Sequence, residues 1–320
     1  MRRRQFLSVA GAGLAGWALE ARAQPVQRVA ILTPSQTQWQ PRAFREALGE
    51  RGYREGVNLR IEVFSGENRL DRLPVLATEI VASEPDVIVA VNTPGTHAAM
   101  AATQTIPILS AIVADPVFLG IVKNIARPEA NVTGVANMAT DITSKRIALL
   151  KEAIPSARRF ALFAHPDEPI VEPQVQDVER SSASLEIEHR TFFMRTLEDL
   201  QRGLQFAAEW RANAVVRLAG QGFALGAATG RLATERQLPS MLMQKQDVEA
   251  GGPMSYFADH RELWRRIAFY VDRLLKGAAP SELPFELPTR FELVLNLKTA
   301  KLLGVSLPTS LIARADDVIE

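Results

Sequence analysis

Short β-branched runs alternate with longer helical patterns along most of this chain, and this alternation constrains the fold more than any other feature. The run Arg28-Val-Ala-Ile-Leu-Thr33 predicts a first strand, and the segment 41–51 predicts a helix with Phe44 and Leu48 on one face. Gly52 follows, at the position where helices often end in a left-handed residue. Strands and helices in this order are typical of α/β folds with a parallel sheet.

The same pattern repeats in two series of similar period and length. In the first series, we expect strands at 57–64, 86–91, 108–113 and 132–135 and helices at 70–83 and 95–103. In the second, we expect helices at 142–153, 171–184, 197–210, 224–236 and 259–276 and strands at 159–163, 185–192, 214–218, 240–243 and, last, 291–297. A chain of 320 residues without a low-complexity linker predicts two lobes that the backbone enters more than once.

The first 23 residues have the three parts of an export signal. Arg2 to Arg4 form a cationic start, residues 10–19 are apolar, and Ala21-Arg22-Ala23 is an A-x-A cleavage site. The apolar stretch is too short for a membrane span, which needs about 20 residues. Arg3-Arg4-Gln5-Phe6-Leu7 is similar to the core of twin-arginine leaders, and an ordinary secretory leader is the alternative. The leader has no cysteine, so we expect no lipoprotein anchor.

Removal of this leader changes the sign of the net charge. The full chain has 37 basic and 36 acidic residues, and without the four arginines and one glutamate of the leader 33 and 35 remain. A near-neutral protein lacks the positive field that attracts nucleic acid or an anionic membrane, so neither is an expected partner. The chain has no cysteine, which excludes disulfides and thiolate metal sites.

The groups that could support catalysis do not form a recognisable motif. His97, His165, His189 and His260 are the four histidines, and none has metal-ligand spacing to another. The segment Gly220-Gln221-Gly222-x-x-x-Gly226 departs from the dinucleotide-binding spacing, and no acidic residue follows at the distance that ribose binding requires. We therefore expect no enzyme, no cofactor and no metal site. An exported α/β enzyme is kept as an alternative.

Ligand contacts are expected just after the strands, because small molecules bind beyond the carboxyl ends of open parallel sheets. The candidates at these positions are uncharged hydrogen-bonding groups with one acid: Ser35, Gln36, Asn92, Thr93, Asp115, His165, Gln221 and Gln244. The alternative role for Ser35 and Thr93 is to cap a helix, and for Asn92 to close a turn. Asp115 precedes Pro116, so its alternative role is that of an N-cap.

Several sequence blocks, in order along nearly the whole chain, resemble one protein family. They include Leu48-Gly-Glu-Arg-Gly-Tyr-Arg-Glu-Gly-Val-Asn58, Asn131-Val-Thr-Gly-Val135, Thr289-Arg-Phe-Glu-Leu-Val-Leu-Asn-Leu-Lys-Thr-Ala-Lys-Leu-Leu-Gly304 and the tail 308–320. The chain is similar in these blocks to ABC transporter substrate-binding proteins, the family that includes the tryptophan- and tyrosine-type uptake components of bacteria.

The resemblance implies a type I periplasmic-binding fold, in which two Rossmann-like lobes with parallel sheets are joined by a hinge of several crossings. It places the signal peptide at 1–23, the first lobe at 24–138 with about 258–288, and the second lobe at 139–257 with about 289–320. Three hinge crossings are then expected near 136–141, 255–259 and 284–291. The chain departs from the family at 136–138, 164–169, 220–222 and Phe257, on loops expected to face the ligand, and the first of these adds Asn137 to the candidates.

The function that the resemblance implies is uptake. We expect a monomeric periplasmic receptor that closes on a small polar or zwitterionic solute, such as an amino acid, and presents it to an ABC permease in the inner membrane. In this interpretation Asp115 pairs with the ligand ammonium, while Ser35, Asn92 and Thr93 bind the carboxylate. A ligand-sensing module of a receptor is a further alternative.

Overall fold

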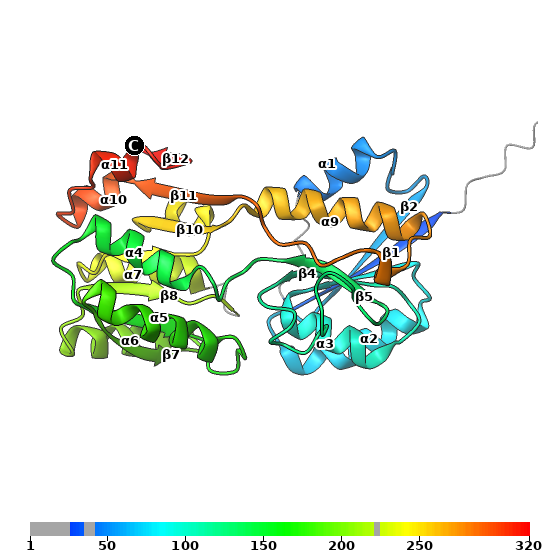
Figure 1. Ribbon diagram of the computed structural model, residues 1–320, viewed down its shortest axis with the longest axis horizontal. Coiled ribbons are helices and arrows are strands. Elements are labelled where there is room, and N and C mark those ends of the chain that lie inside the picture. The colour runs from blue at the N-terminus through cyan, green and yellow to red at the C-terminus, as the bar shows by residue number, and fades with distance from the viewer. Residues whose placement is uncertain (1–25, 35–41, 221–224) are drawn as a thin grey trace, which may run out of the picture.

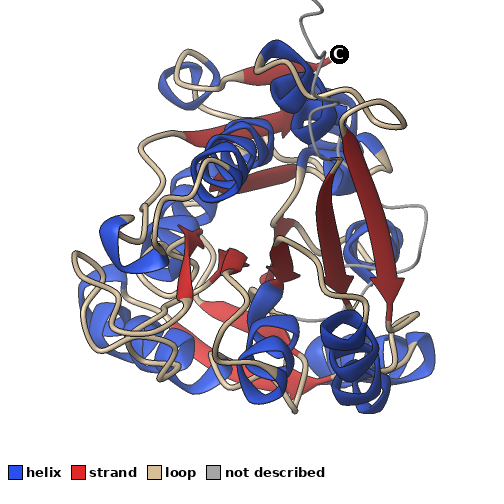
Figure 2. Cartoon of the chain, turned by 90° about the vertical axis from the view of Figure 1, so that its right-hand side faces the viewer, coloured by secondary structure: helices blue, strands red, loops and turns tan. Residues whose placement is uncertain are grey.

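The computed structural model describes residues 26–34, 42–220 and 225–320, which form two α/β lobes side by side (Figure 1). The expected leader lies outside the described residues. In both lobes the helices lie on the outer sides of the strands (Figure 2). No helix within the described ranges is long and apolar enough to cross a membrane.

The first lobe is built on a five-stranded parallel sheet in the order β2-β1-β3-β4-β5. Its strands are β1 (Gln27–Thr33), β2 (Leu59–Ser65), β3 (Val87–Val91), β4 (Ile108–Val113) and β5 (Val132–Ala136). Its helices are α1 (Arg42–Glu50), the 3-10 turn η1 (Leu70–Arg72), α2 (Leu73–Ala82), α3 (Asn92–Ala102) and α9 (His260–Leu275).

Helices cover both faces of the first sheet, with α1 and α9 on one face and α2 and α3 on the other (Figure 1). Every residue of β3 and β4 is buried, as continuous apolar strands of a covered parallel sheet should be. On the predicted face of α1, Phe44 packs edge-on against Trp264 of α9, with ring centroids 5.7 Å apart. The C-terminal helix α9 therefore belongs to the core that the first strands begin.

The second lobe is built on a seven-stranded sheet in the order β12-β11-β10-β9-β8-β6-β7. Its strands are β6 (Arg159–Ala164), β7 (Glu188–Phe193), β8 (Ala214–Arg217), β9 (Ser240–Leu242), β10 (Met254–Ala258), β11 (Phe291–Asn296) and β12 (Asp317–Ile319). Its helices are α4 (Thr143–Ala153), α5 (Val171–Leu185), α6 (Leu197–Glu209), α7 (Gly226–Glu235), α8 (Lys245–Glu249), α10 (Leu297–Leu302) and α11 (Thr309–Ile312).

The alternation of side chains along β6 supplies two apolar layers in the second lobe. Phe160 and Leu162 point into the cluster that includes Ile147 of α4, whereas Phe163 points into the opposite cluster with Leu204 of α6. Successive side chains of a strand point to opposite faces, so one short run contributes to both layers. Helices can then cover both sides of the sheet.

The backbone passes between the lobes three times. Residues 137–142 lead from β5 to α4, residues 258–260 lead from β10 to α9, and the segment after η3 (Pro280–Glu282) leads to β11. Within this third crossing, Glu286 forms backbone hydrogen bonds to Gly134 and Ala136 of β5, and its carboxylate pairs with both Nε (2.5 Å) and Nη2 (2.6 Å) of Arg266 on α9. The third crossing is thus attached to the first lobe as far as residue 286.

The predicted fold class is confirmed, and four details differ from the expectation. β10 pairs antiparallel with β11, so the second sheet is mostly and not wholly parallel. The strand near 291–297 is not the last one, because β12 follows it. The short elements β10, α8, α10, α11 and β12 were not predicted; segments of three to six residues carry too little periodicity to detect. Helix α3 begins at Asn92 and not at Gly95, since Pro94 is tolerated in a first helical turn.

Candidate ligand-binding site

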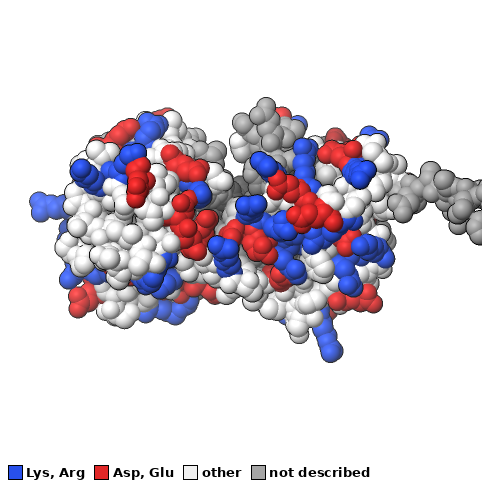
Figure 3. Space-filling view, turned by 90° about the horizontal axis from the view of Figure 1, so that it is seen from above, with Lys and Arg blue, Asp and Glu red and all other residues white. Residues whose placement is uncertain are grey.

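The candidate site is the furrow between the two lobes (Figure 3). β3 and β4 of the first lobe and β6, β8 and β9 of the second run parallel to their neighbours, so their carboxyl ends lie at one edge of each sheet. The crossing 137–142 starts at the edge of the first sheet where β5 ends. The residues that follow these strands therefore line the approach between the lobes.

In the first lobe, Asn92 and Thr93 form the start of α3. The N-cap of this helix is Val91, which supplies no side-chain hydrogen bond, so Thr93 lies inside the helix and does not cap it. Asn92 has φ +58°, in the left-handed region that asparagine tolerates better than most residues. The first N–H groups of α3 consequently lack a side-chain acceptor from the N-cap.

Asp115 has a structural role in this lobe. Its Oδ1 accepts hydrogen bonds from the backbone N–H groups of Val117 and Phe118, both at 3.0 Å, as in the N-cap alternative considered from the sequence. The turn that Asp115 closes presents Phe118 to solvent, with 55% of that residue exposed. Asp115 thus shapes an apolar part of the rim.

Asn137 holds the first crossing to β4. Its Nδ2 donates to the Ile112 carbonyl (3.2 Å), its Oδ1 accepts from the Ala139 N–H (2.9 Å), and its own N–H donates to the Val113 carbonyl (2.8 Å). Ile112 has φ +60° and Met138 has φ +53°, conformations that are strained for side chains of this kind. Such strain persists only where surrounding contacts over-determine it, and the buried Asn137 provides these contacts.

In the second lobe, His165 follows β6 and Gln244 follows β9. His165 Nδ1 accepts from the Asp167 N–H (3.3 Å), and burial lowers the pKa of this imidazole, so it is mostly neutral near pH 7. Arg195 pairs with both carboxylate oxygens of Asp167 at 2.6 and 3.0 Å, which fixes the loop outside the histidine. Three other candidates, Ser35, Gln36 and Gln221, lie outside the described residues.

Beneath this rim lie four buried charged side chains, Arg146, Arg217, Glu168 and Asp247. Arg146 is 0% exposed, and its Nη2 donates to the carbonyls of Arg217 (2.6 Å) and Leu242 (3.1 Å). Arg217 Nη1 donates to the carbonyl of Leu218 (2.7 Å). Burial lowers the pKa of Arg146 to about 9 and that of Arg217 to about 10, and it raises the pKa of Asp247 to about 6.

Two glycines lie directly against the acidic members of this group. A Cβ atom at Gly220, where φ is +133°, would overlap the side chain of Glu168, and one at Gly226 would overlap the carboxylate of Asp247. Gln174 of α5 adds a third restraint, because its amide both donates to the Ala219 carbonyl (3.0 Å) and accepts from the Ala219 N–H (2.8 Å). The chain around Gly220 is therefore positioned by buried polar groups. No pattern in the sequence indicates that these polar groups are buried.

A cavity of about 340 Å³ lies where the second and third crossings meet the second lobe. Its lining comes from β10 and β11, the residues next to them and the start of α8 after β9: Met243, Gln244, Lys245, Gln246, Ser255, Phe257, Ala258, Asp259, His260, Arg261, Arg290 and Glu292. Gln244, one of the candidates expected from the sequence, is in this set. The cavity is lined mostly by polar side chains and lies directly beside the hinge.

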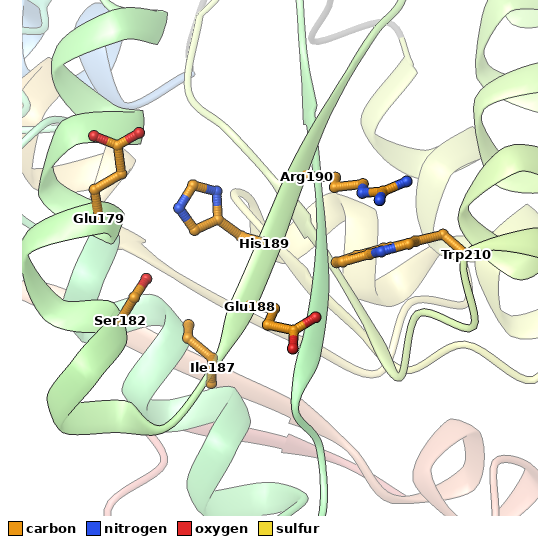
Figure 4. A pocket seen from close by; sticks show the side chains of 7 residues that line it. All are labelled: Glu179, Ser182, Ile187, Glu188, His189, Arg190 and Trp210. Carbon is orange, nitrogen blue, oxygen red and sulfur yellow. The ribbon is translucent and has the colours of Figure 1, made fainter.

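A larger hollow of about 430 Å³ lies on the outer edge of the second lobe, along β7 (Figure 4). His189 points towards Glu179 of α5, whereas Arg190 points to the other side of the strand and lies 5.0 Å from the ring centroid of Trp210. Its lining is spread over both faces of an edge strand, so it is a shallow surface and not a chamber. Within the described residues, no three His, Asp or Glu side chains are placed to hold a metal ion.

Comparison with known proteins gives one consistent result. The family model described as "ABC transporter substrate binding protein" matches residues 29–319. A tyrosine-binding protein of Clostridioides difficile is 24% identical over 275 residues, which cover 82% of this chain and 76% of that protein.

Two solved structures have the same fold along most of the chain. A conserved domain protein from Vibrio cholerae is 25% identical with a TM-score of 0.83 and covers 92% of this chain and 99% of its own. An ABC domain from Streptococcus pneumonia in complex with L-Trp is 22% identical with a TM-score of 0.81 and covers 91% and 100%.

Proposed function

The chain belongs to the family of ABC transporter substrate-binding proteins, and on this basis we propose that it is an exported receptor for an amino-acid-like solute. Proteins of this family bind small solutes and work with a permease, and catalysis forms no part of the proposal. The observation that carries it is the pair of α/β lobes joined by three crossings, with the carboxyl ends of their strands at the furrow. Two such lobes can close on a solute by hinge bending.

We infer that the solute is a zwitterion with an aromatic or branched side chain. The start of α3 offers N–H groups without an N-cap acceptor, and Asn92 and Thr93 lie beside them. Helix N-termini of this kind favour a carboxylate. The exposed Phe118 on the same rim provides apolar surface for a side chain. Names of relatives that refer to tyrosine and L-Trp support this class.

Binding of a solute panel to the mature chain tests this proposal. Thermal unfolding should be followed with each common L-amino acid, with nucleosides and with small dicarboxylates. A ligand present at 100 times its Kd stabilises the folded state by about 2.7 kcal/mol, which is readily detected. Stabilisation by one or a few amino acids, confirmed by calorimetry, is the expected result. Stabilisation by nucleosides alone would contradict the proposed class.

We further propose a periplasmic location, a monomeric receptor and export through the leader 1–23 by the twin-arginine route. A partner permease in the inner membrane completes the proposal. Replacement of both Arg3 and Arg4 by lysine should stop export if the twin-arginine translocase recognises the leader. Continued export of this variant would instead indicate the general secretory pathway.

A further inference from the structure

The hinge cavity has a face that is defined by strand register. Phe257 of β10 is paired with Glu292 of β11, and Ser255 is paired with Val294 two positions away. Side chains of paired residues lie on the same face of a sheet, so Ser255, Phe257 and Glu292 project to one side of the ribbon. All three line the cavity, which α8 and α9 close with Gln244 and His260.

The cations around this cavity are already paired or face solvent. Lys245 Nζ lies 2.5 Å from a carboxylate oxygen of Asp317, and Arg290 lies 3.5 Å from Asp259 and 3.8 Å from Asp316. The remaining cation of the lining, Arg261, is exposed. None of them is within ion-pair distance of Glu292.

Glu292 is therefore an acid without a close ion-pair partner. It has no ion pair and no hydrogen bond within the part of the chain that the structure describes, although it is only partly exposed. Burial raises the pKa of its carboxyl, the negative charge of Asp259 adds to this shift, and the more distant positive charge of Lys245 opposes it only in part. A positively charged group that entered the cavity would relieve both effects.

His260 supplies a second acceptor in the same cavity. Its Nε2 is buried and has no hydrogen-bond partner among the described residues. The ring packs against Phe257 with centroids 5.9 Å apart, which limits its rotation. Burial lowers the pKa of His260 to about 4, so at neutral pH the imidazole is uncharged and one ring nitrogen can accept a hydrogen bond. A buried acceptor without a donor is unfavourable, and a ligand donor would remove this penalty.

We propose that the hinge cavity binds the ammonium group of the solute, with Glu292 as its counter-ion and the Nε2 atom of His260 as a hydrogen-bond acceptor. An ammonium group carries only donors, and both side chains present acceptors to it. A ligand carboxylate would be repelled by Glu292, and a neutral hydroxyl would leave its charge uncompensated. The inference rests on the proposed function and assigns to Glu292 the role first expected of Asp115.

Three related probes separate the ammonium from the rest of the solute: L-tyrosine, tyramine, which lacks the carboxylate, and 3-(4-hydroxyphenyl)propanoate, which lacks the ammonium. Calorimetry of the full mature chain should show that Glu292→Gln lowers the affinity for L-tyrosine and for tyramine by about 30-fold or more. This is the loss expected when a desolvated charge partner is removed. Binding of the propanoate should change less than about threefold. His260→Phe keeps an aromatic ring against Phe257 but removes the acceptor, and it should lower the affinity for both amines by about tenfold.

Glu79→Gln is the matched control, because Glu79 is an exposed acid on α2 without a side-chain partner among the described residues. It should bind all three probes like the parent chain. Melting temperatures establish that each variant folds. If Glu292→Gln does not fold, Glu292→Asp retains the charge at a shorter reach and should bind the amines with intermediate affinity.

The outcomes distinguish the subsite from the proposed function. Equal binding of L-tyrosine by the parent chain and by Glu292→Gln would overturn the subsite and leave the function intact. If the parent chain binds tyramine but no amino acid, the proposed solute class fails, and loss of tyramine binding in Glu292→Gln would still support the subsite. Failure to bind any ammonium-bearing probe would overturn the subsite.

Discussion

The two lobes have the same architecture, but they support the furrow in different ways. In the first lobe, the strained groups are in the backbone: Asn92, Ile112 and Met138 have positive φ where β3, β4 and β5 end. Its buried residues are otherwise apolar or uncharged, with Asp272 on α9 as the buried charge among those described. In the second lobe, the unfavourable contribution to folding comes from side chains, because Arg146 and Arg217 are buried together with two acids.

This difference determines how each lobe should respond to substitution. A strained φ acts locally and depends on the residue at one position, so glycine can relieve it. A buried charge acts on its neighbours, and its removal leaves their charges uncompensated. We therefore expect large, coupled losses of stability in the second lobe and smaller, independent ones in the first.

The largest effect is expected for Arg217→Ala. Removing one member of a buried ionic group costs about 3–5 kcal/mol of unfolding free energy, because Glu168 and Asp247 lose a compensating charge. Chemical denaturation measures the loss. Arg231→Ala, which removes an exposed arginine paired with Glu235, serves as the control and should cost less than about 1 kcal/mol. Similar losses in the two variants would show that the buried group is not coupled.

The next effect is a pH dependence of the free energy of unfolding, which originates in the second lobe. Burial raises the pKa of Asp247 to about 6, above the value of about 4 expected in the unfolded chain. The folded state then binds the extra proton, so this contribution to stability is present below pH 4 and is lost as the pH rises through 6. The total change is about 3 kcal/mol.

The variant Asp247→Asn isolates the contribution of this carboxyl to the pH dependence of stability. The difference in unfolding free energy between the parent chain and this variant should change by about 2–3 kcal/mol between pH 4 and pH 8, with the parent chain losing stability relative to the variant. The low pKa of His260, near 4, affects both chains equally and cancels in the difference. A difference that is constant with pH would argue against a buried, proton-linked Asp247.

A smaller effect is expected in the first lobe, at Asn92. Asn92→Ala places a less tolerant residue at φ +58° and should cost about 1 kcal/mol, whereas Asn92→Gly should retain most of the stability. Both variants remove the side-chain amide, so both should bind the solute more weakly if that amide is a contact. Equal stability of the two variants would show that the left-handed backbone is not the source of the cost.

The smallest effect is expected for Asp115→Asn. An asparagine Oδ1 can still accept from the N–H groups of Val117 and Phe118, so the turn should persist and solute affinity should change less than about threefold. Calorimetry checks this. A loss of 30-fold or more would restore Asp115 as the ammonium partner and would contradict the assignment to Glu292.

Periodicity in the sequence was sufficient to predict two α/β lobes with parallel sheets, because long helices such as α9 and β-branched strands such as β4 have unambiguous patterns. The type I periplasmic-binding architecture followed from the family resemblance. The rule for carboxyl ends of strands also selected Asn92, Thr93, His165 and Gln244, whose contact with a ligand stays a prediction. It could not find Arg217, since an arginine after Ala-Val-Val carries no sign of whether its side chain is buried. Nor could it predict the backbone of Ile112, because β-branched residues favour the extended conformation that this one does not adopt.

The attachment of Glu286 to the first lobe has a mechanical consequence. After this residue only 287–289 span freely, because the Arg290 carbonyl is again held, by the N–H of Asp259 in the second crossing. Two of the three connections are thus short tethers fastened to each other and to one lobe. Tethers of this kind permit rotation about an axis through them but resist sliding of one lobe past the other. Because displacement grows with distance from the axis of rotation, a given opening of the lobes separates the walls of a site beside the axis less than those of a site at the outer rim.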